Sequence, residues 1–178
     1  MVWFLFGILC CCLFLVGFAY FKMNALNKAV KVAYQRLDLA SKDRAALIDQ
    51  LINAVQTLDD IDPVKLEELD KLKQIPSEWD KRVAREDNIT RLFKYIFTVT
   101  RDHPEVELST AFEKLQNRVI KAEGDYRKNK SKYNTAVHSF YVFGELIPFN
   151  WICWAMEMAK PQYFTAPDQE HNAQVGTN

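Results

Sequence analysis

Two patterns of hydrophobic and polar positions divide this chain. The first 21 residues, MVWFLFGILCCCLFLVGFAYF, carry no charged side chain, and Lys22 is the first charge. At about 1.5 Å rise per residue, a helix of that length spans roughly 30 Å, the thickness of the hydrocarbon core of a bilayer. Aromatic rings favour the headgroup level, and four stand near the two ends: Trp3, Phe4, Tyr20 and Phe21. The pattern predicts a membrane-spanning helix over residues 1–21.

The charges around this apolar stretch predict its orientation. Only the α-amino group precedes the stretch, and four basic residues follow it closely: Lys22, Lys28, Lys31 and Arg36. Because basic residues favour the cytoplasmic side, we expect the N-terminus outside and the rest of the chain in the cytoplasm. A cleaved signal peptide is the alternative, since Gly17-Phe18-Ala19 offers small residues for cleavage. A signal peptide, however, has a basic first region and a shorter apolar core.

Beyond the apolar stretch, a 4-3-4-3 spacing of apolar residues predicts long helices that pack side by side. The first series runs from Leu26 to Leu58, and Arg44 is its one member that is not apolar. This helix is expected to continue from the span without a break, because no Pro or Gly intervenes after Gly17. The second series runs from Leu108 to Ile147, in a helix predicted over Glu105 to Ile147, and includes the strongly polar Asn129. A polar residue in such a seam lowers stability but can fix the register.

Three further helices are predicted from shorter patterns. Residues 63–75 form a short amphipathic helix with Asp62 as its N-cap. Residues 78–101 form another long helix, and we interpret its charge-rich part, Asp80 to Asp87, as a solvated face. A short helix over Trp151 to Met158 follows.

Together these elements predict an all-α fold. A transmembrane helix at residues 1–21 precedes an elongated antiparallel bundle at residues 22–164, with three long helices and one or two short ones, and a disordered tail at residues 165–178. If the connections are short, the first long helix leads away from the membrane, the second returns and the third leads away again. The segment from Pro148 to Phe164 is then expected at the end of the bundle farthest from the bilayer.

Composition gives no sign of catalytic chemistry or of nucleic-acid binding. Lys plus Arg and Asp plus Glu each total 23 among 178 residues, so the formal net charge is zero and no nucleic-acid partner is expected. Cys153 has no cysteine partner outside the apolar stretch, which excludes a disulfide framework within one chain. The three histidines are isolated in the sequence, and no nucleotide or metal motif occurs. We therefore expect no enzymatic activity, no cofactor and no metal.

Arg44 and Glu123 are candidates for a buried ion pair. Each lies about 20 residues from the start of its predicted helix, so parallel helices would place both near 30 Å from the membrane end. Pairing would compensate the loss of hydration of Arg44 in the seam. The alternative is that the Arg44 side chain extends along the surface to water and has no partner.

A second candidate site is an apolar cluster near the C-terminus: Trp151, Ile152, Trp154, Met156 and Met158. At the end of a bundle little core remains to cover these side chains. They therefore either cap the bundle or form a surface for a partner or a second copy.

Short motifs follow one another without a gap from His103 onward: Pro104, Phe112, Leu115, Gln116, Glu123, Tyr133-Asn134, Val137, Phe140, Ile147-Pro148, Asn150 and Tyr163-Phe164. Others lie in the first long helix: Ala33, Leu37, Asp38, Leu39, Arg44, Leu47, Ile48 and Leu51. In this order and spacing they resemble the LemA family. His103, Tyr141 and Asp49-Gln50 depart from its usual residues, and the stretch from Asp59 to Asp102 does not match well.

The resemblance implies a bacterial, membrane-anchored helical bundle with no settled enzymatic activity, and some relatives act in forming magnetosome membranes. We therefore expect a single-pass protein of the bacterial cytoplasmic membrane whose bundle is a scaffold or assembly platform, for instance in membrane shaping. Its partners would be the bilayer and a second copy or another membrane protein. The alternative is an adaptor or regulatory subunit of a membrane enzyme such as a protease or transporter.

Overall fold

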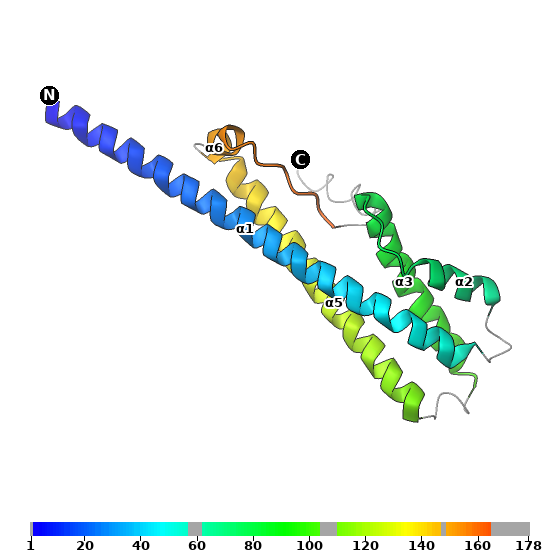
Figure 1. Cartoon of the computed structure of the whole chain (residues 1–178). Helices are drawn as coiled ribbons and strands as arrows, with labels where there is room; N and C mark the ends of the chain where they lie inside the picture. Colours follow the sequence, from blue (N-terminus) through cyan, green and yellow to red (C-terminus); the bar gives the residue numbers. More distant parts are fainter. Residues whose placement is uncertain (1, 57–61, 104–109, 147–148, 165–178) are drawn as a thin grey trace, which may run out of the picture. The chain divides into compact units, whose positions relative to one another are not determined.

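The computed structural model describes residues 2–56, 62–103, 110–146 and 149–164, and every regular element in these ranges is a helix (Figure 1). The helices are α1 (Val2–Val55), α2 (Pro63–Lys71), α3 (Trp79–Thr100), α5 (Thr110–Gly144) and α6 (Phe149–Ala155). The predicted all-α class, with three long helices and short ones beside them, is confirmed. The tail predicted at residues 165–178 lies outside the described residues.

These helices contribute to two compact units. The first unit comprises Met1–Arg36 and Lys130–Tyr163, and the second comprises Leu37–Asn129 and Phe164–Asn178. The helices α1 and α5 each supply one part to the first unit and one part to the second.

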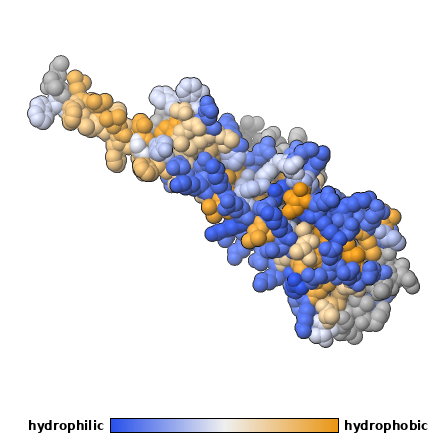
Figure 2. All heavy atoms as spheres, in the orientation of Figure 1, coloured by the Kyte–Doolittle hydropathy of each residue, from blue (hydrophilic) through white to orange (hydrophobic). Residues whose placement is uncertain are grey.

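The apolar stretch and the first heptad series form one continuous helix, α1, of 54 residues. This continuity was predicted from the absence of helix breakers and is confirmed. The N-terminal turns of α1 expose large hydrophobic side chains, which Figure 2 shows as the hydrophobic end of the molecule's surface. Within the described residues, α1 is the one helix long and apolar enough to cross a membrane. A signal sequence can have the same length and composition.

In the second unit, α3 runs in the same direction as α1. Side chains bonded between the two helices are always separated by a similar number of residues: 44 for Asp38 and Arg82, 42 for Arg44 and Glu86, and 46 for Arg44 and Thr90. A constant separation means that both residue numbers rise together along the contact. The prediction that the second long helix returns antiparallel to the first is therefore wrong.

The reason is that the connection between α1 and α3 is not short. The backbone N–H of Asp62, before α2, donates to the Tyr95 hydroxyl near the end of α3 at 3.2 Å. The Leu72 carbonyl, after α2, accepts from Arg85 Nε near the start of α3 at 2.6 Å. The segment containing α2 thus carries the chain back along α3 before α3 begins. Asp62 is the N-cap of α2, as predicted, and accepts from the Val64 N–H at 2.9 Å.

The helix α5 runs antiparallel to α1 in each unit. In the first unit, Lys22 lies against Phe143 and Tyr34 lies against Tyr133. In the second unit, Arg44 pairs with Glu123, and Arg118 donates to Gln50. Residue numbers on α5 therefore fall as those on α1 rise.

The antiparallel direction of α5 changes the expected place of α6. In the first unit, a Cβ at Gly144, the last residue of α5, would lie 4.0 Å from Met23 Cε and 3.7 Å from Cys153 Sγ of α6. The helix α6 thus lies beside the end of the apolar stretch. The prediction that this segment lies at the end farthest from the stretch is wrong, because it assumed the opposite direction for α5.

Hydrophobic residues of α1, α2, α3 and α5 form the core of the second unit. The α1 and α5 members occupy the predicted heptad positions or their neighbours, and they include Leu47, Leu51, Phe112, Leu115 and Val119. The helix α2 adds Leu69, and α3 adds Phe93 and Ile96. The heptad spacing therefore identifies the buried faces of α1 and α5.

Candidate functional site

A buried cluster of charged and polar side chains joins α1, α3 and α5 in the second unit. The Arg44 side chain is 0% exposed, and its Nη1 lies 2.6 Å from Glu86 Oε2. Its Nη2 donates to Thr90 Oγ1 at 2.7 Å and to the Glu86 carbonyl at 3.2 Å. The guanidinium of Arg44 thus binds α3 through two side chains and a backbone carbonyl.

The predicted partners Arg44 and Glu123 lie together in this cluster. Arg44 Nη2 is 2.6 Å from Glu123 Oε1, and the Thr90 hydroxyl lies 3.2 Å from Glu123 Oε2. The contact is ionic rather than a directed hydrogen bond, because the N–H groups of Nη2 point to Thr90 and Glu86. The two residues meet between antiparallel helices. The prediction had placed them on parallel helices, at the same distance from the membrane end.

Glu86 is the residue of the cluster that sequence reasoning missed. Its carboxylate accepts hydrogen bonds from Arg44 Nη1, Arg85 Nη1 and Ser41 Oγ, and its side chain is 0% exposed. The interpretation of residues 80–87 as a solvated face is wrong for Arg82, Arg85 and Glu86, which are all buried. A signal was present, because Glu86 lies three residues after Val83 and three before Ile89, at the spacing of the buried face.

Arg82 and Arg85 of α3 add two buried positive charges. Arg82 bonds Asp38 of α1, and Lys42 lies 2.8 Å from the same carboxylate. Burial alone would raise the pKa of Asp38, but the bonds and charges of Lys42 and Arg82 lower it overall. Burial lowers the pKa of Arg85, and the neighbouring Glu86 carboxylate opposes that shift.

The Tyr126 ring of α5 closes the cluster on one side. The Arg44 guanidinium carbon lies 4.2 Å from the ring centroid, within the range of a cation–π contact. Burial, together with the Glu86 charge, raises the pKa of the Tyr126 hydroxyl. That hydroxyl is buried, and within the described part of the chain no hydrogen-bond partner lies near it.

The cluster is built to hold helices together. Arg44, Arg82 and Arg85 are buried with Glu86 and Glu123, and the partly buried Asp38, which pairs with Arg82, balances the third positive charge. A solvent-borne substrate could not reach Arg44 or Glu86 without opening of the bundle, because both side chains are withdrawn from water. Among the described residues, no three His, Cys, Asp or Glu side chains are grouped as metal ligands would be.

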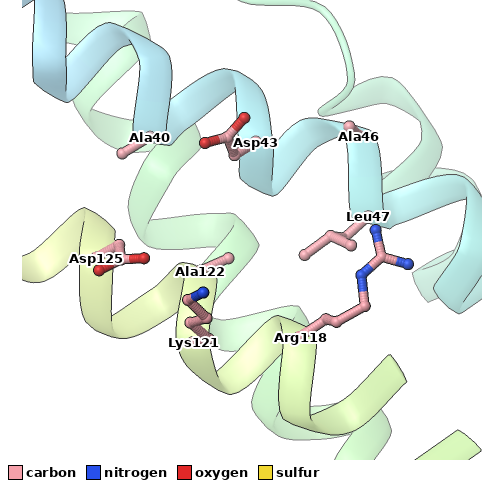
Figure 3. A pocket seen from close by; sticks show the side chains of 8 residues that line it. All are labelled: Ala40, Asp43, Ala46, Leu47, Arg118, Lys121, Ala122 and Asp125. Carbon is pink, nitrogen blue, oxygen red and sulfur yellow. The ribbon is translucent and has the colours of Figure 1, made fainter. Parts of the chain in front are cut away.

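An open pocket of about 350 Å³ lies between α1 and α5 in the second unit. Its lining consists of apolar residues, Ala40, Ala46, Leu47 and Ala122, and of exposed charged residues, Asp43, Arg118, Lys121 and Asp125. Figure 3 shows Asp43 on α1 and Asp125 on α5 on either side of the opening, with the Arg118 side chain extending toward α1. Arg118 Nη1 donates to Gln50 Oε1 at 2.6 Å. The charges of this pocket are hydrated, in contrast to those around Arg44.

Asn129, predicted as the polar residue of the seam, turns back to its own helix. Its side-chain N–H donates to the Asp125 carbonyl at 2.8 Å, one turn earlier on α5. The described contacts of Asn129 therefore include no bond to a second helix, and they give no support to a role in fixing register.

The predicted apolar cluster of α6 and the residues after it divides into two parts. Ile152, Met156 and Met158 are half-buried, as a cap would be. Trp151 is 68% exposed and Trp154 is 83% exposed. The exposed part is a surface of large apolar side chains without cover in the described structure.

The segment after α6 packs against α5 through residues of the sequence motifs. In the first unit, the Tyr133 hydroxyl donates to the Gln162 carbonyl at 2.7 Å, and burial raises the pKa of Tyr133 to about 12. In the second unit, Phe164 is buried against the rings of Trp79 and Tyr126. The Tyr-Asn and Tyr-Phe motifs thus have packing roles.

Fold and site together define an all-helical protein with one long apolar N-terminal helix and a buried ion cluster that joins three helices. The model of the LemA family matches residues 33–177, and the chain belongs to the LemA family. The match runs through residues 59–102, which sequence reasoning had left outside the resemblance. A comparison with curated proteins found no match.

Proposed function

We propose that this protein is a single-pass membrane protein whose helical bundle is a scaffold, or assembly platform, at the membrane surface. The observation that carries the proposal is the continuity of α1. One unbroken helix leads from the exposed apolar stretch to Arg44, where α3 and α5 are bonded to it. A span of this kind tethers the bundle through a helix and not through a flexible linker.

The proposed location is the cytoplasmic membrane of a bacterium, with the N-terminus outside and the bundle in the cytoplasm. The basic residues Lys22, Lys28, Lys31 and Arg36 support this orientation, because all of them follow the apolar stretch. The large exposed side chains of that stretch support a retained span.

A structural role without chemistry is supported by how the reactive groups are used. The charged groups around Arg44 bond one another, and the side chains of Arg44 and Glu86 are closed to water. Burial raises the pKa of the Cys153 thiol, although the Lys160 charge opposes the shift, so the thiol is a weak nucleophile at neutral pH.

Cysteine crosslinking in intact membranes tests the proposed platform. The native cysteines would first be replaced by alanine, and a single cysteine then placed at Leu39 or Ile120, which are exposed on α1 and α5 of the second unit. A scaffold should give a homotypic dimer with either single cysteine, and ladders of homotypic products longer than a dimer when cysteines at Leu39 and Ile120 are combined in one chain. A cysteine at the buried Ile48 is the matched control and should give no product.

Each other outcome has a defined meaning. A single product with one different membrane protein would replace the scaffold with an adaptor or regulatory subunit. Absence of any product at several exposed positions would reject both forms of assembly.

Orientation is tested separately with an epitope tag at the C-terminus. The tag should resist protease in sealed cells and be cleaved after lysis, and cleavage in sealed cells would reverse the proposed orientation.

A further inference from the structure

We infer that α6 lies in the water–lipid interface of the bilayer that α1 crosses, with Trp151 and Trp154 at the level of the lipid headgroups. The inference rests on the proposed membrane span. It adds a second contact between this chain and the same bilayer, made by a segment about 130 residues after the span.

The position of α6 in the first unit is the first argument. Lys22, the first charge after the apolar stretch, has its Nζ 4.8 Å from the centre of the Phe143 ring of α5. Phe143 in turn packs against Phe149, the first residue of α6, with 5.8 Å between ring centroids. Phe143 thus connects Phe149, the first residue of α6, to Lys22, the residue at the end of the hydrocarbon core.

The burial of α1 at this level supports the same position. Ala19 lies inside the apolar stretch, three residues before the first charge, yet it is 1% exposed. Met23, one turn later on the same helix face, is fully buried. Other parts of the chain thus cover α1 at the last turn of its apolar stretch, where a bilayer would have its headgroup region.

The chemistry of α6 suits that environment. No charged residue occurs between Glu145 and Glu157. Trp151 and Trp154 are three residues apart, so they share a face of the helix, and both indoles are exposed. Indole rings partition to the headgroup level because they combine a large apolar surface with one N–H donor.

The surroundings of α6 favour lipid over a protein as the occupant of this face. Phe21 at the end of the apolar stretch and Leu146 before α6 are also exposed apolar residues of the first unit. Phe21 must meet lipid if α1 spans the bilayer. A bilayer that surrounds Phe21 reaches the level of Phe143 and Phe149, and no separate partner is needed to cover the two tryptophans.

Depth-dependent quenching of tryptophan fluorescence tests the inference on the full chain in vesicles of zwitterionic and anionic phospholipid. In the variant Trp3→Phe with Trp79→Phe, only Trp151 and Trp154 emit. Lipids brominated near the headgroup should quench this emission several-fold more than lipids brominated near the bilayer centre. The emission should also lie at a shorter wavelength than that of indole in water.

Two further variants are the controls. In a chain without native tryptophan, Tyr34→Trp places one indole 12 residues beyond Lys22 on α1, roughly 18 Å along the helix. Brominated lipid should leave that emission nearly unchanged. In a variant that keeps only Trp3, quenching reports the span alone.

The outcomes separate this inference from the proposed function. If Trp3 is quenched but Trp151 and Trp154 are quenched no more than the indole at position 34, the span stands and the interfacial position of α6 is wrong. If Trp3 also escapes quenching, the proposed span itself fails. Circular dichroism of each variant checks that the helices are retained.

Discussion

Arg44 on α1 and Glu86 on α3 form an ion pair that is fully withdrawn from water, with 2.6 Å between Nη1 and Oε2. Removing two charges from water costs several kcal/mol per ion, and their attraction offsets this only when the remaining donors and acceptors are also bonded. Here Thr90 bonds the guanidinium, and Ser41 and Arg85 bond the carboxylate, whereas Arg44 Nε has no hydrogen-bond partner among the described residues. The pair thereby couples the register of α1 to that of α3.

Replacing Glu86 by Gln should lower the free energy of unfolding by about 3 kcal/mol, because Arg44 and Arg85 would lose the carboxylate that both contact. Glu123→Gln should lower it by less, because Glu123 borders the surface and contacts only Arg44 among the guanidinium groups of the cluster. Thermal and denaturant unfolding of the full chain in detergent measures both losses.

The matched control is Glu67→Gln on α2. Glu67 pairs with Lys71 at 2.7 Å, but both side chains are exposed, and such surface pairs contribute between 0 and about 1 kcal/mol. If Glu86→Gln proves no more destabilising than this control, the buried cluster does not hold the helices together as described.

Removing the hydroxyl of Tyr126 or of Tyr133 should have opposite consequences. Tyr126→Phe keeps the ring beneath Arg44 and removes a buried hydroxyl that has no partner in the described residues, so stability should stay the same or increase. Tyr133→Phe removes the bond to the Gln162 carbonyl and should destabilise by about 1 kcal/mol. Equal losses in parallel melting experiments would mean that the Tyr126 hydroxyl has a partner after all.

The contribution of Asp38 should depend on pH in a defined direction. Its pKa is lowered from the ordinary value of 3.8 in the folded chain, so the unfolded chain binds its proton more readily. The stabilisation is therefore present above about pH 4 and is lost as the pH falls through the folded pKa. The difference in stability between the native chain and Asp38→Asn should be largest near neutral pH and shrink below pH 4. Denaturant titrations across that range measure it, and a difference that grows in acid would contradict the assigned direction.

Gly124, in the interior of α5, should be a site for stabilisation. A Cβ added there would meet nothing within 4 Å, and Gly lowers helix stability relative to Ala by about 0.5–1 kcal/mol. Gly124→Ala should raise the free energy of unfolding by that amount, and Gly124→Val by less, because Val is a poorer helix former. An unchanged or lower melting temperature for Gly124→Ala would show that the open space beside Gly124 is filled.

The sequence predicted part of the buried cluster and missed its centre. Arg44 was recognised as the exception in an apolar series. Glu123 was proposed as its partner because both were expected at a similar distance from the membrane end on parallel helices. Glu86 was missed because it stands in a charge-rich run: six of the eight residues from Asp80 to Asp87 are charged, and a charged run is usually hydrated. Whether such a run is hydrated depends on which helix face meets a neighbour, and that is a property of the packing.

By itself, the sequence determined the helices of this protein. The uncharged stretch, the 4-3-4-3 spacing and the scarcity of Gly and Pro are local properties, and they define where α1 and α5 run and which faces are apolar. The tertiary structure decided the directions of the helices: α2 carries the chain back so that α3 runs parallel to α1, and α5 returns to place α6 beside the apolar stretch. Periodicity contains no information about direction, because an apolar face is equally complementary to a parallel and an antiparallel neighbour. Only the specific contacts around Asp62, Leu72, Arg44 and Lys22 distinguish the two.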